Sequence, residues 1–314
     1  MRWISLILPI ILLMGEISAI AQEPPDRSWI AAVKDATVAI GTIRTARVQA
    51  PKGPADKDIF AIVGTGVIML PPGQKEGPPW LVTAKHVLYN PAMKWDPDAI
   101  QIRFNWFDHK PVDEYLGITI RLKEKDRRLW IAHKDPAVDL AAIPLDISAL
   151  EAGRATAGPV PVQLYASAND VFEGASVLVF GYPGAVGPTY WTKAVVRAGI
   201  VAWTDPDRPV SNPFLIDSAI YPGNSGGPVF KVPAGLDRQG NPSLGGKVAF
   251  LGIISQGRKA INPLRAAGRE VELQGPAGPT AVLSEQWVGI GVVEPAERVK
   301  ELLVQAYESR KRAK

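Results

Sequence analysis

Short segments rich in β-branched and aromatic residues recur along most of the chain, and clusters of glycine, proline and polar residues separate them. Such segments predict strands, and many short strands with turns between them are typical of all-β barrels or sandwiches. The 29 glycines and 29 prolines among the 314 residues supply the turns that this pattern needs. We expect strands at 36–44, 59–70, 80–83, 99–107, 117–124, 128–133, 139–144, 175–181, 189–203, 214–220, 227–231, 247–255 and 286–293.

Three stretches interrupt the strand pattern. Residues 51–58 are charged and contain proline and glycine, and residues 256–285 form a longer polar stretch; we expect both to be surface loops. Residues 146–160 have little strand signal, which favours a domain boundary. The sequence therefore predicts an N-terminal β-barrel at 22–155 and a C-terminal β-barrel at 156–293.

The last segment has a helical pattern. Pro295 suits a first helical position, and four apolar side chains after it share one helical face. These residues are Val299, Leu302, Leu303 and Ala306. We expect residues 294–314 to form a helix that packs against a barrel and ends in a basic tail. We interpret the cluster Arg310-Lys311-Arg312 as the solvated end of this helix, where positive charge complements the helix dipole.

The first residues have the pattern of a targeting segment. Arg2 precedes an apolar run at 3–14, and Ala19-Ile20-Ala21 offers small residues for cleavage. The run is too short for a comfortable transmembrane span. We interpret residues 1–21 as a secretory signal peptide, with an uncleaved anchor as the alternative. The sequence therefore predicts an exported protein, periplasmic or secreted, with no stable membrane anchor after the signal is removed.

Composition excludes several kinds of chemistry. The chain has no cysteine, so disulfides, thiolate catalysis and cysteine-based zinc sites are excluded. Its three histidines, His86, His109 and His133, do not form the H-E-x-x-H pattern of zinc proteases. The net charge of +4 comes from dispersed charges of both signs, so we expect no nucleic-acid partner. We also expect no metal and no cofactor.

The stretch from Tyr221 to Val229 reads Tyr-Pro-Gly-Asn-Ser-Gly-Gly-Pro-Val, and it places Ser225 between glycines. Glycine permits the backbone angles and close approaches that present a serine as a nucleophile beside N–H groups for an oxyanion. The alternative is an ordinary tight turn. Residues 223–227 also fit the G-x-S-x-G elbow of α/β-hydrolases. That class is excluded, because its histidine follows the serine and no histidine follows His133 here.

A serine nucleophile needs a base and an acid that orients the base. His86 is the best base, because it follows a strand that has the pattern of a buried one. We predict that His109 and His133, which lie among charged residues, are solvated surface residues. Asp139 is the best acid, since a carboxylate at the head of an apolar run needs a donor such as an imidazole. Asp135 is the main rival, and the alternative role for Asp139 is to cap a strand.

These motifs resemble those of the chymotrypsin-like (trypsin-like) serine proteases. The matching residues are Thr83-Ala84-Lys85-His86, Asp139-Leu140-Ala141 and Gly223-Asn224-Ser225-Gly226-Gly227-Pro228. The chain is most similar to the protease domain of bacterial HtrA/Deg proteins, through 64–68, 198–201, 217–222, 251–253 and 288–291. The resemblance implies two six-stranded antiparallel β-barrels. It also implies a serine endopeptidase that acts on polypeptides, with catalytic His86, Asp139 and Ser225 and an oxyanion hole made by the N–H groups of Gly223 and Ser225.

The chain also departs from the HtrA/Deg pattern. We expect no PDZ domain after the protease portion, and Tyr221 stands where that group usually has asparagine. Ala219, six residues before the serine, falls at the base of the family's S1 pocket, which predicts small or aliphatic P1 residues. Ile253, Ile254 and Ser255 are expected to line the substrate and pair with its backbone.

Two other functions remain open on the sequence alone. A binding protein could keep the protease fold without turnover, and an esterase could use the same three catalytic residues.

Overall fold

The structure is a computed structural model that describes residues 28–50, 53–74, 78–106, 117–125, 127–145, 155–156, 159–160, 164–187, 193–266, 269–270, 272–275 and 278–312. The predicted signal peptide, His109 and most of the predicted domain boundary lie outside these residues. Within the described ranges, no helix is both long enough and apolar enough to cross a membrane.

The first half of the chain forms a seven-stranded antiparallel sheet in the order β6-β4-β1-β2-β3-β10-β9. Its strands are β1 (Thr37–Ala50), β2 (Gly53–Met69), β3 (Trp80–Thr83), β4 (Ala99–Arg103), β6 (Gly117–Arg121), β9 (Ile131–Ala132) and β10 (Ala141–Pro144). All four residues of β3 are buried, since the strand lies inside the sheet between β2 and β10. This buried strand supports the residues that follow it.

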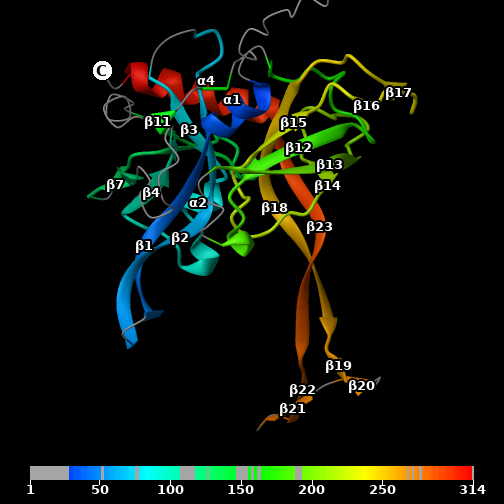
Figure 1. Cartoon of the computed structure of the whole chain (residues 1–314). Helices are drawn as coiled ribbons and strands as arrows, with labels where there is room; N and C mark the ends of the chain where they lie inside the picture. The colour runs from blue at the N-terminus through cyan, green and yellow to red at the C-terminus, as the bar shows by residue number, and fades with distance from the viewer. Residues whose placement is uncertain are drawn as a thin grey trace, which may run out of the picture.

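The second half forms a closed antiparallel barrel in the order β12-β13-β14-β23-β18-β15. Its strands are β12 (Ser176–Gly181), β13 (Val195–Trp203), β14 (Phe214–Asp217), β15 (Pro228–Lys231), β18 (Ala249–Pro263) and β23 (Leu283–Pro295). Buried apolar side chains, among them Phe214, Ile216 and Leu251, fill its core. Figure 1 shows this barrel beside the first sheet.

Three α-helices lie in the described part of the chain: α1 (Trp29–Ala36), α2 (Lys85–Leu88) and α4 (Ala296–Arg312). The Ser28 hydroxyl caps α1 by accepting the Ala31 N–H at 3.2 Å. The apolar face predicted for the last helix is confirmed, because its four predicted residues are fully buried. Trp29 of α1 packs on Phe180 and Phe230 of the barrel. Both helices therefore contribute to one core that also contains residues of both halves.

Short elements complete the described structure. They are β5 (Asn105–Trp106), β7 (Lys123–Glu124), β8 (Arg127–Arg128), β11 (Ala155–Thr156), β16 (Gly235–Leu236), β17 (Pro242–Ser243), β19 (Arg265–Ala266), β20 (Arg269–Glu270), β21 (Glu272–Gly275), β22 (Gly278–Ala281) and the 3₁₀ turns η1 (Pro91–Met93) and η3 (Gly184–Val186).

The predicted all-β class and C-terminal helix are confirmed, and so is a six-stranded barrel for the second half. The first half differs in detail from the expected barrel of six strands. Its hydrogen-bonded order links seven strands and ends, among the described residues, at β6 and β9. β9 pairs over only two residues, which leaves too short a strand to continue the ladder.

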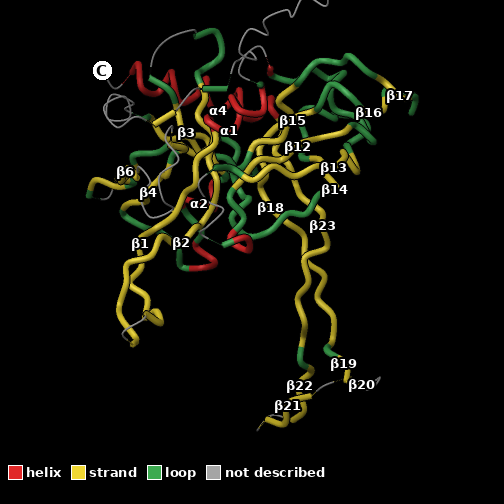
Figure 2. The backbone as a smooth tube through the Cα atoms, in the orientation of Figure 1, coloured by secondary structure: helices red, strands yellow, loops and turns green. Residues whose placement is uncertain are grey.

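Two stretches expected to be loops are largely strand. Residues 53–58 begin β2 and pair with β1 as far as Ala50↔Gly53. In 256–285, the two ends extend β18 and β23, which pair as far as Pro263↔Leu283, and the short strands β19 to β22 lie between them. Both pairs form ribbons that extend away from the body (Figures 1 and 2). An antiparallel ladder needs only backbone hydrogen bonds, so polar side chains on a ribbon conceal it from a hydrophobic pattern.

His133 is buried, so its prediction as a solvated surface residue is wrong. Its exposed fraction is 4%, and its Nδ1 accepts the Asp135 N–H at 3.1 Å. Its Nε2 lies 3.2 Å from Oε2 of Glu301 on α4. A neutral ring that accepts at Nδ1 carries its proton on Nε2, and so it donates to the Glu301 carboxylate. Burial lowers the pKa of His133 below its ordinary value of 6.5, although Glu301 opposes the effect.

This lowered pKa predicts a loss of stability in acid. The unfolded chain binds the proton of His133 more readily than the folded protein, so the free energy of unfolding decreases as the pH falls below about 6.5. Each tenfold difference in proton affinity corresponds to about 1.4 kcal/mol. We expect His133→Gln to reduce the decrease in Tm between about pH 7.5 and 5.5, measured by circular dichroism. Equal pH slopes for the two proteins would contradict this assignment.

Candidate active site

The antiparallel pairing of β3 and β10 brings His86 and Asp139 together. Ala141, the first residue of β10, pairs with Thr83, the last residue of β3. His86 follows the end of β3, and Asp139 precedes the start of β10, so both lie at the same end of the two strands. Because β3 is fully buried, it holds this end in place.

Two contacts join His86 to the Asp139 carboxylate. The His86 backbone N–H donates to Asp139 Oδ1 at 3.0 Å, and the ring atom His86 Nδ1 lies 2.6 Å from Asp139 Oδ2. The Lys85 N–H donates to the Asp139 carbonyl oxygen at 3.1 Å. A carboxylate at Nδ1 holds the proton there and leaves Nε2 as a proton acceptor. The His86 side chain is one-third exposed, at 33%, so Nε2 is open to a reacting group.

The loop that carries Ser225 connects β14 to β15 in the second barrel, and it packs against the first sheet. The Thr65 N–H in β2 donates to the Ser225 carbonyl oxygen at 2.7 Å. The Thr65 hydroxyl donates to the Gly223 carbonyl oxygen at 2.7 Å and accepts the Tyr182 N–H at 3.0 Å. One buried threonine therefore holds the serine loop through both its backbone and its side chain.

Glycine permits this approach at two positions. A Cβ added at Gly64 would lie 3.0 Å from the Ser225 carbonyl oxygen and 2.6 Å from a methyl group of Val87, the residue after His86. Gly226 has a φ of +89°, and a Cβ there would overlap the Thr65 carbonyl oxygen. The serine loop thus reaches the turn that carries His86 only because these side chains are absent.

The Ser225 hydroxyl does not yet engage the histidine. Among the hydrogen bonds of the described residues, Ser225 Oγ donates to the Ser255 carbonyl oxygen at 3.5 Å and not to His86. Hydrogen bonds of a catalytic serine are often long or misaligned without substrate. A rotation about the Cα–Cβ bond of Ser225 would redirect the hydroxyl.

Two backbone N–H groups were predicted to form an oxyanion hole. Among the described residues, neither the Gly223 N–H nor the Ser225 N–H donates a hydrogen bond. The carbonyl group of each preceding peptide is held from the other side: Pro222 accepts the Gly184 N–H at 2.9 Å, and Asn224 accepts the Gly227 N–H at 2.9 Å. Since C=O and N–H point in opposite directions in a trans peptide, both free N–H groups face away from these contacts.

Two of the predicted substrate-binding residues, Ile253 and Ile254, are fully buried. The Ile254 backbone accepts the Gly226 N–H at 2.7 Å and donates to the Gly227 carbonyl oxygen at 2.9 Å. Ile254 therefore holds the serine loop, and its contact with a substrate stays a prediction. Of the three residues, Ser255 is the one whose carbonyl oxygen lies beside Ser225 Oγ.

An apolar wall near the site includes a residue that the sequence analysis did not single out. Ala219 is half-buried as expected, but the next residue, Ile220, is buried against two glycines. A Cβ at Gly257 would lie 3.3 Å from Ile220 and 2.8 Å from the Trp287 ring, and one at Gly291 would lie 2.8 Å from Ile220. Only knowledge of which strands pair could have placed Ile220 here.

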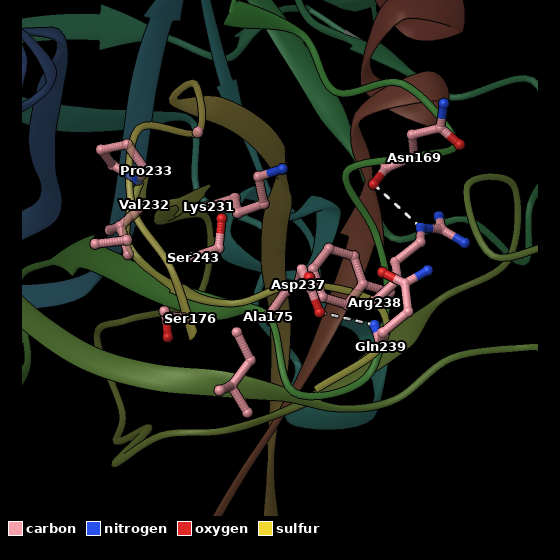
Figure 3. A pocket seen from close by; sticks show the side chains of 15 residues that line it. Asn169, Ala175, Ser176, Lys231, Val232, Pro233, Asp237, Arg238, Gln239 and Ser243 are labelled. Carbon is pink, nitrogen blue, oxygen red and sulfur yellow. Dashed lines mark hydrogen bonds between the residues drawn. The ribbon is translucent and has the colours of Figure 1, made fainter. Parts of the chain in front are cut away.

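A separate hollow of about 280 Å³ lies on the barrel, and its lining does not include His86, Asp139 or Ser225 (Figure 3). Lys231, Asp237 and Arg238 line it together with uncharged residues. Lys231 is paired with Asp170 at 2.7 Å, and Arg238 donates to backbone carbonyl oxygens, including that of Asn169 at 3.3 Å. Elsewhere in the described part of the chain, no group of three His, Asp or Glu side chains is arranged to hold a metal ion.

An antiparallel β protein with an imidazole–carboxylate pair beside a serine flanked by glycines has the architecture of a serine hydrolase. The family described as "Trypsin-like peptidase domain" matches residues 64–235, which is more than half of the chain. The protein therefore belongs to this family of serine peptidases. No curated protein matches the chain.

Replacing the buried threonine tests how the serine loop is held. Thr65→Val keeps the shape but removes the hydroxyl that donates to the Gly223 carbonyl oxygen and accepts the Tyr182 N–H, which costs about 1–3 kcal/mol. We expect a correspondingly lower free energy of unfolding in urea. Thr45→Val is the matched control, because the Thr45 hydroxyl is exposed and donates to Asp58 at 2.8 Å. The two variants should differ by more than about 1 kcal/mol; an equal effect would contradict the role of Thr65.

Proposed function

We propose that the protein is a serine endopeptidase in which Ser225 is the nucleophile, His86 the general base and Asp139 the orienting acid. The observation that carries the proposal is the 2.6 Å contact between His86 Nδ1 and Asp139 Oδ2. This pair belongs to the sheet whose Thr65 is bonded to the Ser225 carbonyl oxygen. Each residue has the chemistry that its role needs.

In the proposed reaction, Ser225 Oγ attacks the carbonyl carbon of a peptide bond while His86 Nε2 accepts the hydroxyl proton. Asp139 stabilises the imidazolium that forms. The C–N bond then breaks, His86 gives its proton to the leaving amine, and an ester remains on Ser225. Water, activated by His86 in the same way, hydrolyses this ester and restores the serine.

The N–H groups of Gly223 and Ser225 would bind the oxyanion of each tetrahedral intermediate. Loss of one such donor costs about 2.7–4 kcal/mol of transition-state stabilisation in enzymes of this kind. Gly184 and Gly227 support this role, since they hold the preceding carbonyl groups on the opposite side. These contacts support the proposal that both N–H groups are available to the oxyanion.

We propose an apolar pocket for small or aliphatic P1 side chains. Ala219 has an uncharged methyl side chain. Ile220 narrows the space beside Gly257 and Gly291, and Trp287 narrows it further beside Gly257. The atoms nearest to a Cβ at Gly257 or Gly291 are carbon atoms of Trp287, Ile220 and Ile216, which supports an apolar pocket instead of one built for lysine or arginine.

The finer placement of the protein rests on its motifs. We propose a position close to the HtrA/Deg proteases, polypeptide substrates, and export to the periplasm or the medium after removal of residues 1–21. We also propose the division into units at 22–155, 156–293 and 294–314. The barrel strands run from Ser176 to Pro295, which supports one unit over this range and ends it two residues beyond 293.

One observation favours a second candidate. The Ser225 hydroxyl bonds the Ser255 carbonyl oxygen, and a protein that kept this bond would be a catalytically silent binding protein with the protease fold. An esterase would show the same labelling of Ser225 as a protease but would cleave esters alone.

The decisive test combines labelling with turnover. Wild-type protein should react with a fluorophosphonate probe and cleave casein, whereas Ser225→Ala should lose labelling and reduce kcat by about 10⁶-fold. Ser284→Ala, on the β18–β23 ribbon, is the control and should behave as wild type. Absence of labelling in the wild type would favour the silent protein, and labelling without peptide cleavage would favour the esterase.

The P1 proposal is tested with a peptide library. We expect cleavage after alanine, valine and leucine, because the wall at Ile220 excludes larger side chains. Ile220→Ala should shift the preference toward phenylalanine, and Ile200→Ala, which removes an exposed isoleucine from β13, should leave it unchanged. A wild-type profile dominated by lysine, arginine or glutamate would refute the apolar pocket.

A further inference from the structure

Glu294 is a buried carboxyl group beside the catalytic pair. It is the second-last residue of β23, and Pro295 separates it from the start of α4. Its exposed fraction is only 4%. No motif in the sequence marks it. A buried glutamate is unusual unless its oxygens have partners, so its contacts indicate why it is there.

Glu294 has one hydrogen-bond partner among the described residues. Its Oε1 accepts the Asp139 N–H at 3.1 Å, while the buried Oε2 has none. The nearby cations Lys85 and Arg298 direct their donors elsewhere. Lys85 Nζ donates to two backbone carbonyl oxygens at 2.8 and 3.2 Å, and Arg298 donates to Ser211 and Glu301. Glu294 is therefore an acceptor for the backbone of Asp139 and not one half of an ion pair.

This contact completes the support of Asp139. Both carboxylate oxygens of Asp139 contact His86, and its carbonyl oxygen accepts the Lys85 N–H. Lys85 and His86, which make those contacts, lie in α2 directly after β3 of the first sheet. Glu294 instead lies in β23 of the second barrel. The N–H of Asp139 is thus the point at which the barrel holds the acid.

The same ladder also holds the nucleophile. Glu294 pairs with Ile253 across β23 and β18, and the next residue of β18, Ile254, bonds to Gly226 and Gly227. Neighbouring rungs of one ladder therefore contact the acid and the serine loop. A change at Glu294 would move Asp139 relative to Ser225.

We propose that Glu294 is a positioning residue for the reaction, and that its carboxyl oxygen holds the backbone of Asp139 so that His86 faces Ser225. This inference rests on the proposed serine peptidase activity. Burial raises the pKa of Glu294, and the charge of Asp139 adds to the effect, whereas the hydrogen bond from the Asp139 backbone and the charges of Arg298 and Lys85 oppose it. The acceptor at Oε1 remains available whether or not the group is ionised, so an amide can replace it.

The test compares two kinds of variant. Glu294→Gln keeps an acceptor, whereas Glu294→Met and Glu294→Ala remove it. Glu297→Gln, at an exposed position of α4, is the control for loss of a carboxylate. kcat and KM are measured on a peptide substrate below the unfolding midpoint of each variant. The use of two variants without an acceptor protects the test against one that does not fold.

We expect Glu294→Met and Glu294→Ala to lower kcat by about 10²-fold, as a misplacement of catalytic groups does, with KM changed by less than about threefold. Glu294→Gln and Glu297→Gln should stay within about threefold of wild type in kcat. In Glu294→Met, the acid limb of the kcat/KM profile should move to lower pH, because a displaced Asp139 stabilises the His86 imidazolium less.

Wild-type kcat in folded Glu294→Met or Glu294→Ala would overturn the inference. So would an equal loss in Glu294→Gln, since that result would make the charge and not the acceptor decisive. Both outcomes presuppose an active wild type. If the wild type itself shows no Ser225-dependent labelling, the proposed function fails instead, and the two failures are thereby distinguished.

Discussion

The contact between Thr65 and the serine loop is the interaction on which the site depends. Each half of the chain provides part of the catalytic group, His86 and Asp139 from the sheet and Ser225 from the barrel. The Thr65 N–H and hydroxyl bind two carbonyl groups of the serine loop. Such bonds are directional and buried, so they define distance and orientation together, and a mispaired arrangement would leave polar groups without partners.

The ladder between β18 and β23 provides the second connection. It holds the serine loop through Ile254 and the backbone of Asp139 through Glu294. Sites supported by strands are held more precisely than sites supported by loops alone. His86 lies in the short helix α2, and Asp139 and Ser225 lie in loops, yet strand residues hold both loops through hydrogen bonds.

The sequence predicted the three proposed catalytic residues because their chemistry is scarce in this chain. With only three histidines, their order relative to Ser225 excluded one hydrolase class. The wrong predictions concern how residues are packed and paired in the fold. His133 lies among charged residues in sequence, but α4 covers it, and no local pattern shows that a helix more than 160 residues later supplies Glu301. The two ribbons were predicted as loops for a similar reason, because backbone pairing does not require a hydrophobic pattern in the side chains.

The sequence by itself determined the all-β class, the amphipathic last helix and the identity of the groups that could carry acyl transfer. These depend on residue type and local periodicity, which a single chain displays directly. Tertiary structure alone decided that Gly64 and Gly226 allow the two halves to meet, that Ile254 supports the serine loop, and that Glu294 reaches Asp139. Those facts depend on which strands pair and in what register, and hydrogen bonds between residues over 150 positions apart are not encoded in any local pattern.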